Sequence, residues 1–120
     1  MKSKHLMAIL PDQQPKSGQG VFADFMGQQA YTMTLFSKIA AKTKVPVVMA
    51  VAERLPDGKG FDIHLKAVGK AIQEAGDESV VCLNQAIADM VEINPAQYQW
   101  TYRRFSIQAG GSKPYRRSNT

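Results

Sequence analysis

The sequence has little cysteine, no long apolar run and no signal-peptide pattern. Cys82 is the single cysteine among 120 residues, so no disulfide can form within the chain, and a reducing compartment is expected. No stretch approaches the roughly 18 apolar residues that a membrane-spanning helix needs, and residues 1–10 lack the apolar core of a signal peptide. We therefore expect a chain that is soluble or bound peripherally to a membrane surface.

Several common catalytic and binding patterns are also missing. Gly18 and Gly20 form G-x-G, but Ala23 stands where a dinucleotide-binding motif needs its third glycine. The Lys-Ser or Lys-Thr pair of a P-loop does not follow these glycines either. There is no G-x-S-x-G nucleophile elbow, which argues against a serine or cysteine triad without excluding one. His5 and His64 have no second ligand at metal-binding spacing, so no zinc site is predicted. No cofactor is predicted either.

The positive charge is concentrated at the C-terminal end. The net charge is +5, and residues 103–117 contain five cations and no acid, which equals the whole surplus. Such a segment suits anionic lipid, phosphate or nucleic acid, although a solvated end without a partner explains it equally well. We expect residues 1–108 to form one globular domain and residues 109–120 a disordered basic tail.

The hydrophobic pattern predicts an α/β fold. Residues 6–10 form a short apolar run that predicts a buried strand, and residues 30–44 have helical periodicity. Residues 45–52 are apolar on both faces, as in a central parallel strand covered by helices. A right-handed crossover should place the two predicted strands parallel in one sheet.

The second half of the pattern predicts a hairpin and another helix. Asp57 and Gly58 favour a turn, after which residues 61–66 alternate apolar and polar like a half-exposed antiparallel strand. Residues 77–93 have helical spacing, with Asp77 or Ser79 as the cap. This sheet is thin for a central strand that is apolar on both faces, so we expect the chain to be part of something larger.

Polar and aromatic residues near the N-terminal end suggest a binding site. Asp12 and Gln13 follow the first predicted strand, where ligands of parallel sheets gather; a loop-capping role for Asp12 is the alternative. Phe22, Phe25 and Met26 are predicted to form an apolar flap over the core or over an acyl chain.

Other polar residues have plainer interpretations. Glu53 and Arg54 end the predicted central strand and could act on a substrate. Neighbouring opposite charges at a strand end are more often solvated, and this is the simpler interpretation. His64 alternates with apolar neighbours and is predicted to face solvent, and Cys82 is predicted to be a small core residue.

The segment 95–105 is the most informative stretch of the chain. Arg103 and Arg104 stand between Tyr102 and Phe105, in a segment that also holds the single tryptophan. Arginine forks bind phosphate, and the rings suit a membrane interface. Alternatively, the aromatic rings pack the last turn onto the sheet and the arginines pair with carboxylates; both descriptions can hold together.

Four blocks in order resemble the lipid A biosynthesis acyltransferases of the lauroyl/myristoyl type. They are Leu10-Pro-Asp-Gln-Gln, the segment 20–27 with its Gly-Val and Phe-Met-Gly, the strand 45–49, and the segment 95–105 with its Trp and Arg-Arg-Phe. The match runs from about residue 6 to residue 105. Met26 stands where this family usually has Phe, and Tyr102 where it usually has His; both changes keep bulk and should preserve the fold.

The resemblance implies a partial glycerolipid-acyltransferase-like sheet with parallel strands, one antiparallel hairpin strand and two main helices. It implies transfer of a fatty acyl group from acyl carrier protein to a lipid A precursor, in lipopolysaccharide synthesis at the cytoplasmic face of the bacterial inner membrane. In that picture Asp12 and Gln13 line the acceptor pocket and the flap residues shape its apolar wall. Arg103 and Arg104 lie near phosphates or the membrane.

The catalytic motif of this family, H-x4-D/E, is absent from the sequence. The positions five residues after His5 and His64 are Leu10 and Gly69. We therefore expect the chain to correspond to the C-terminal half of such an enzyme, to be inactive alone, and to have the missing N-terminal half as a possible partner.

Two other functions compete with this one. The first is a small basic module that binds anionic lipid or phosphate without catalysis, through Arg103, Arg104, Arg116 and Arg117; nucleic acid is not expected. The second is a chain without function that folds poorly and aggregates through exposed sheet edges.

Overall fold

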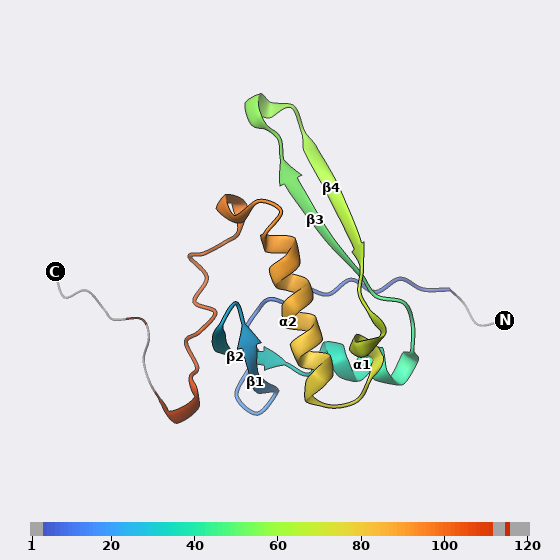
Figure 1. Cartoon of the computed structure of the whole chain (residues 1–120), viewed down its shortest axis with the longest axis vertical. Coiled ribbons are helices and arrows are strands. Elements are labelled where there is room, and N and C mark those ends of the chain that lie inside the picture. The colour runs from blue at the N-terminus through green and yellow to red at the C-terminus, as the bar shows by residue number, and fades with distance from the viewer. Residues whose placement is uncertain (1–3, 112–114, 116–120) are drawn as a thin grey trace.

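The structure is a computed structural model that describes residues 4–111 and residue 115. It contains two helices and two small antiparallel sheets, with the longer helix between them (Figure 1). In chain order the elements are β1 (Gly20–Phe25), β2 (Gln28–Met33), α1 (Leu35–Thr43), β3 (Val48–Arg54), β4 (Phe61–Ala67) and α2 (Asp77–Val91). Short 3₁₀ turns lie before and after β4 and follow α2. The predicted α/β class is confirmed at this level.

Helix α2 supplies the centre of the core. Its buried side chains Val80, Leu83, Ile87 and Val91 follow the helical repeat, as predicted from residues 77–93. Leu83, Ile87 and Val91 pack in one cluster with Phe25 of β1 and with further apolar side chains from α1 and the turn before α2. The predicted cap is wrong, because the N-cap residue is a glycine without a side-chain hydrogen bond.

Ser79, one of the two predicted caps, instead has a tertiary role. Its Oγ donates a hydrogen bond of 2.8 Å to the carbonyl oxygen of Ile72, and the side chain is fully buried. The hydroxyl therefore holds the turn before α2 against the helix. Cys82 on the same helix is partly buried and packs against the core, as predicted.

Strands β1 and β2 form a hairpin where the sequence predicted the start of a helix. The strands pair from Gly20↔Met33 to Phe25↔Gln28, and the two-residue turn uses Met26 (φ 53°) and Gly27 (φ 82°). Two consecutive left-handed residues are typical of a tight hairpin turn. The helix predicted over 30–44 is therefore restricted to α1. Its predicted first residues lie in a strand that is buried on both faces, where apolar spacing does not distinguish helix from strand.

The predicted strand at residues 6–10 is wrong for the described chain. This segment has no regular structure, and Leu6 and Leu10 are 97% and 72% exposed. The expected parallel pairing with β3 is not present among residues 4–111, where both sheets are antiparallel. An apolar run forms a buried strand only when a neighbouring strand supplies backbone hydrogen bonds and a covering layer, and the described residues do not provide one here.

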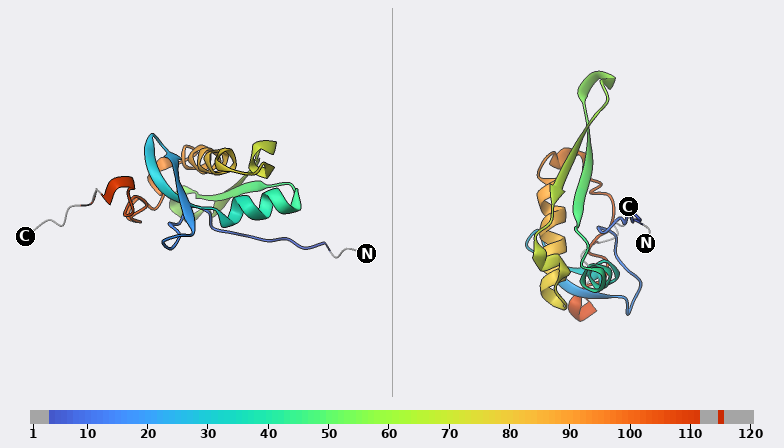
Figure 2. Two further views of the ribbon diagram at one scale, coloured as in Figure 1. Left: turned by 90° about the horizontal axis from the view of Figure 1, so that it is seen from below. Right: turned by 90° about the vertical axis from the view of Figure 1, so that its right-hand side faces the viewer.

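Strands β3 and β4 form the predicted hairpin. They pair from Val48↔Ala67 to Arg54↔Phe61, and the turn uses Asp57 (φ 56°) and Gly58 (φ 66°) as expected. The hairpin extends beyond the end of α2 as an arm, visible in Figure 1 and in the right view of Figure 2. β3 is therefore an antiparallel strand in a two-stranded sheet and not the predicted central parallel strand.

The two faces of this arm differ in their surroundings. One face turns toward α2, where Lys66 forms an ion pair of 2.8 Å with Asp89. The opposite face is exposed and mostly apolar, and we call it the open face of the arm. Its side chains are Val48, Ala50, Ala52, Phe61, Ile63, Leu65 and Ala67, with Arg54 at the end near the turn. A continuous exposed apolar face of this kind marks a contact surface.

Candidate functional site

A cavity of about 280 Å³ lies between β3, the end of α2 and two irregular segments, residues 10–12 and residues 93–99. This volume is close to the lower end of the roughly 300–1,000 Å³ typical of small-molecule pockets. Its walls are apolar where β3 and α2 contribute, and its polar side chains are Asp12, Glu53, Asn94, Gln97, Tyr98 and Gln99. An apolar cavity with a few converging polar groups is the usual form of a binding site.

Asp12 belongs to this cavity and interacts with Tyr98. Burial is the main cause that raises the pKa of the Tyr98 phenol, and the charge of Asp12 and a hydrogen bond to its carboxylate act in the same direction. Gln13, by contrast, is exposed and is not a wall of the cavity. The structure therefore separates the two polar residues that the sequence placed together.

The loop that carries Asp12 is fastened to the C-terminal segment. The backbone N–H of Gln14 donates to the Tyr102 hydroxyl at 2.7 Å, and the Gln14 side-chain oxygen accepts from the N–H of Ile107 at 3.1 Å. These bonds join residues 88 and 93 positions apart in the sequence. The sequence blocks around residues 12 and 102 thus form one unit of structure.

Arg104 is buried inside the fold, with 3% of its surface exposed. Its guanidinium donates to the Tyr31 carbonyl oxygen at 2.6 Å and to the Thr32 hydroxyl at 3.0 Å. It also lies 5.5 Å from the centre of the Phe25 ring. Burial is the main cause that lowers the pKa of Arg104, partly offset by neighbouring phenols and Asp12. Arg104 therefore anchors the C-terminal segment on β2, and its predicted contact with a substrate phosphate stays a prediction.

Arg103 faces a different environment from Arg104. It is exposed, and its guanidinium carbon lies 5.9 Å from the centre of the Tyr115 ring. Trp100 is 57% exposed nearby in the sequence, with its indole N–H donating to the Pro95 carbonyl oxygen at 2.7 Å. The predicted basic tail residues Arg116 and Arg117 lie outside the described residues.

The three predicted flap residues do not share one surface. Phe25 is 2% exposed and packs in the core, with its ring 6.2 Å from that of Phe105. Phe22 and Met26 are 38% and 41% exposed. The reason is the period of a strand, which turns Phe22 and Phe25 to opposite faces of β1.

Comparison with known proteins places these features in a family. The family model described as bacterial lipid A biosynthesis acyltransferase matches residues 1–106. The chain belongs to this acyltransferase family. All four blocks that carried the resemblance lie inside the match. The family predicted from these motifs is thus confirmed.

One curated relative is the lipid A biosynthesis lauroyltransferase of Escherichia coli (strain K12). The two sequences are 26% identical over an alignment of 113 positions that covers 92% of this chain. The chain spans 37% of the length of that relative. Among the described residues, neither helix has the length and apolar character required to cross a membrane.

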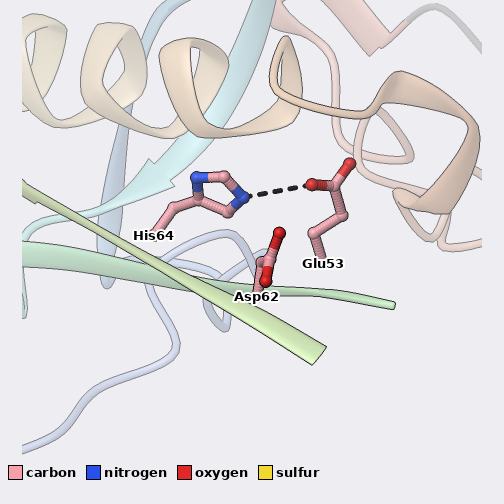
Figure 3. A group of neighbouring side chains, drawn as sticks. All are labelled: Glu53, Asp62 and His64. Carbon is pink, nitrogen blue, oxygen red and sulfur yellow. Dashed lines mark hydrogen bonds and ion pairs between the residues drawn. The ribbon is translucent and has the colours of Figure 1, made fainter. Parts of the chain in front are cut away.

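A second cluster, not predicted from the sequence, lies on the arm. Figure 3 shows Glu53, Asp62 and His64, whose potential ligand atoms all lie within 4.8 Å of one another. His64 Nε2 is 3.1 Å from Glu53 Oε1, and the Asn94 amide donates to Glu53 Oε2 at 2.9 Å. These two bonds, the Asn94 bond first, lower the pKa of Glu53. His64 therefore contacts a carboxylate and does not simply face solvent as predicted.

The strand register explains both why the cluster forms and why it was missed. Glu53 pairs directly with Asp62, and Val51 with His64, so Glu53, Asp62 and His64 share one face of the arm. Residues 53 and 64 are separated by more positions than two ligands on a single helix or strand would be. A search for short motifs along the sequence therefore does not connect them. Aligning the two strands as a hairpin about the predicted turn at Asp57 and Gly58 would have shown that Glu53 lies opposite Asp62.

Proposed function

We propose that the chain forms the C-terminal part of an acyltransferase that transfers a fatty acyl group from acyl carrier protein to a lipid A precursor. The observation that carries the proposal is the family match over residues 1–106. The lauroyltransferase relative supports the substrate class. We place the complete enzyme at the cytoplasmic face of the bacterial inner membrane, where it would serve lipopolysaccharide synthesis, and no cofactor is required.

In this proposal the cavity beside Asp12 is part of the acceptor pocket. Asp12 would accept a hydrogen bond from a hydroxyl of the lipid A precursor, while apolar side chains of β3 and α2 exclude water. Gln13 would contact the precursor from the rim, since its side chain is exposed. Phe22 and Met26 would contact an acyl chain, with Phe25 supporting their hairpin from the core.

The arginines would have separate roles. Arg103 is exposed and can form a bidentate contact with a phosphate of the precursor or of the membrane surface. Arg104 would act indirectly, by holding the segment that carries Arg103 and Tyr98 on β2. The burial of Arg104 supports this indirect role. A guanidinium held inside the fold is not exposed to a lipid surface.

Catalysis in this proposal needs residues outside the sequence. In the family an H-x4-D/E motif provides the histidine that acts as general base on the acceptor hydroxyl, and neither His5 nor His64 is followed by it. The 120-residue chain should therefore show no acyl transfer by itself. The missing residues would pack on the open face of the arm, complete a glycerolipid-acyltransferase-like sheet, and recruit residues 6–10 as a parallel strand.

A chimera tests the acceptor-pocket assignment. This chain would replace the matching 113 residues of the Escherichia coli lauroyltransferase, and acyl transfer from acyl carrier protein to a lipid A precursor would be measured. We expect Asp12→Asn to lower kcat/KM by about 100-fold, the scale of a lost positioning contact. Asp57→Asn, at the exposed tip of the arm, is the matched control and should keep the activity of the chimera.

Two outcomes would contradict these assignments. A folded chimera without acyl transfer would argue against the proposed function, whereas an active chimera that tolerates Asp12→Asn would argue only against the role of Asp12. Acyl transfer by the 120-residue chain alone would show that it contains a base that we have not identified.

The open face of the arm gives a second prediction. Leu65 is 69% exposed, so Leu65→Lys should change the free energy of unfolding of the 120-residue chain by no more than about 0.5 kcal/mol. In the chimera the same change should destabilise the protein by about 2–5 kcal/mol, because a lysine would be buried without a partner. Urea denaturation of both proteins measures the difference.

Gln28→Lys on the exposed end of β2 is the control for added charge. It should have little effect in either protein. Equal effects of Leu65→Lys in the chain and in the chimera would mean that the open face is not covered in the complete enzyme.

A second candidate function is binding of anionic lipid or phosphate without catalysis. The exposure of Arg103 and of Trp100 next to it in the sequence favours this alternative. Vesicles containing an anionic lipid would then bind the chain and release it as the salt concentration rises, because salt screens surface charges. Arg103→Ala should weaken this binding, whereas the acyltransferase proposal does not require the isolated chain to bind vesicles.

A further inference from the structure

The face of the arm that turns toward α2 brings together three side chains with metal-binding atoms. Glu53 of β3 and Asp62 of β4 are direct partners in the strand register, and His64 is the next residue of β4 on the same face. Their ligand atoms lie within 4.8 Å of one another (Figure 3). Positions on paired strands hold side chains more precisely than positions on loops.

The surrounding contacts fix Glu53 but leave negative charge uncompensated. Asn94 donates to one carboxylate oxygen of Glu53 at 2.9 Å, which turns the other toward His64. Lys66, the next cation on this face, is occupied by Asp89 at 2.8 Å. Within the described residues, the Asp62 carboxylate has no hydrogen-bond or ion-pair partner. Two carboxylates thus lie beside one imidazole.

We propose that Glu53, Asp62 and His64 bind a divalent first-row transition metal ion, with Zn²⁺ as the representative ion. Imidazole nitrogen combined with carboxylate oxygen is a donor set that these ions accept. Metal–ligand distances of about 2.0–2.2 Å place neighbouring ligand atoms roughly 3–3.5 Å apart. The distance of 3.1 Å between His64 Nε2 and Glu53 Oε1 meets that requirement. Asp62, whose ligand atom lies within 4.8 Å of the other two, would have to move closer to bind the same ion. Water would complete the coordination.

The donor set also separates this ion from others. Mg²⁺ and Ca²⁺ prefer shells made entirely of oxygen ligands, so a site with an imidazole ligand disfavours them. Asn94 would hold a ligating carboxylate in place, as partners behind metal ligands commonly do. The competing explanation is a simple His64–Glu53 hydrogen bond. In that explanation the exposed Asp62 carboxylate is simply hydrated, and the two explanations differ in whether Zn²⁺ binds.

The site is independent of the proposed acyltransferase function. None of its three ligands belongs to the blocks that carried the family resemblance, which cover residues 10–14, 20–27, 45–49 and 95–105. Glu53 and Asn94 are also walls of the cavity beside Asp12, so a bound ion would lie at the rim of that cavity. Its direct effect would be to join β3 and β4 near the tip of the arm and, through Asn94, to hold them against the end of α2.

Calorimetric titration of the metal-free 120-residue chain with Zn²⁺ tests the proposal. We expect one equivalent of Zn²⁺ to bind, and Mg²⁺ at the same concentration to give no comparable binding. Asp62→Asn and His64→Gln should each weaken Zn²⁺ binding at least about tenfold, and Asn94→Ala by about tenfold. Asp57→Asn, His5→Gln and Cys82→Ser are the matched controls, and they should bind Zn²⁺ as the unchanged chain does.

Thermal unfolding provides a second readout on the same proteins. Zn²⁺ should raise the unfolding temperature of the unchanged chain and of the controls, because an ion that binds only the folded state stabilises it. The increase should be lost in Asp62→Asn and His64→Gln, whose circular dichroism without metal should match that of the unchanged chain. Three results would each overturn the proposal: absence of saturable Zn²⁺ binding, an affinity of Asp62→Asn or His64→Gln equal to that of the unchanged chain, or loss of binding in His5→Gln or Cys82→Ser.

Discussion

Arg104→Ala should lower the free energy of unfolding of the chain by about 3 kcal/mol. Arg104 is 3% exposed and donates to the Tyr31 carbonyl oxygen and the Thr32 hydroxyl. Alanine removes both charge-assisted bonds and leaves the buried carbonyl of Tyr31 without this donor. The C-terminal segment would also lose its contact with the Phe25 ring. Urea denaturation followed by circular dichroism measures the change.

Arg103→Ala is the matched control, because the two arginines are adjacent in sequence but differ in burial. Arg103 is exposed, so its replacement should change stability by no more than about 0.5 kcal/mol. Arg104→Lys should recover only part of the loss, since an ammonium cannot reproduce the planar fork. Equal effects of Arg103→Ala and Arg104→Ala on the free energy of unfolding would show that the buried hydrogen bonds of Arg104 do not stabilise the fold.

Leu83→Ala should destabilise the chain by about 2–5 kcal/mol, the range found when a buried leucine is truncated. Leu83 is fully buried and lies on α2 in the cluster with Phe25, Ile72 and Ile87. The change removes apolar surface from the core and leaves a cavity, while alanine itself suits a helix. The loss is therefore one of packing and is measured by the same denaturation experiment.

Val81→Ala is the control on the same helix. Val81 is 47% exposed, so its truncation should change stability by no more than about 0.5 kcal/mol. If Leu83→Ala were as mild as Val81→Ala, the core would be less tightly packed around α2 than the structure indicates. Both variants should keep Zn²⁺ binding at the arm, which lies outside this cluster.

Elements whose signals are local could be predicted correctly from the order of residues along the chain. Helix α2 was predicted because its apolar side chains recur at helical spacing over four turns, a repeat that only a helix can place on one face. The hairpin of β3 and β4 was predicted from Asp57 and Gly58, which adopt left-handed conformations at low cost. The family followed from residue types in order along the chain, and such blocks do not depend on a correct three-dimensional assignment.

Elements that depend on a distant partner could not be predicted from local signals. Residues 30–33 carry apolar spacing compatible with a helix, yet they pair with β1 because a turn at Met26 and Gly27 brings the strands together. Residues 6–10 carry a strand pattern, but the described residues offer no neighbouring strand to complete it. A short apolar run indicates that a segment favours burial, but it does not indicate which strand or helix will cover it.

The roles of individual side chains followed the same rule. Arg103 and Arg104 are identical in chemistry, and only the packing of the C-terminal segment on β2 buries one and exposes the other. Glu53 and His64 looked solvated along the chain, and only the strand register turned them to the face that Asp62 shares. Local sequence determines the conformation that a segment prefers, whereas the direction and neighbours of a side chain depend on contacts between residues far apart in the chain.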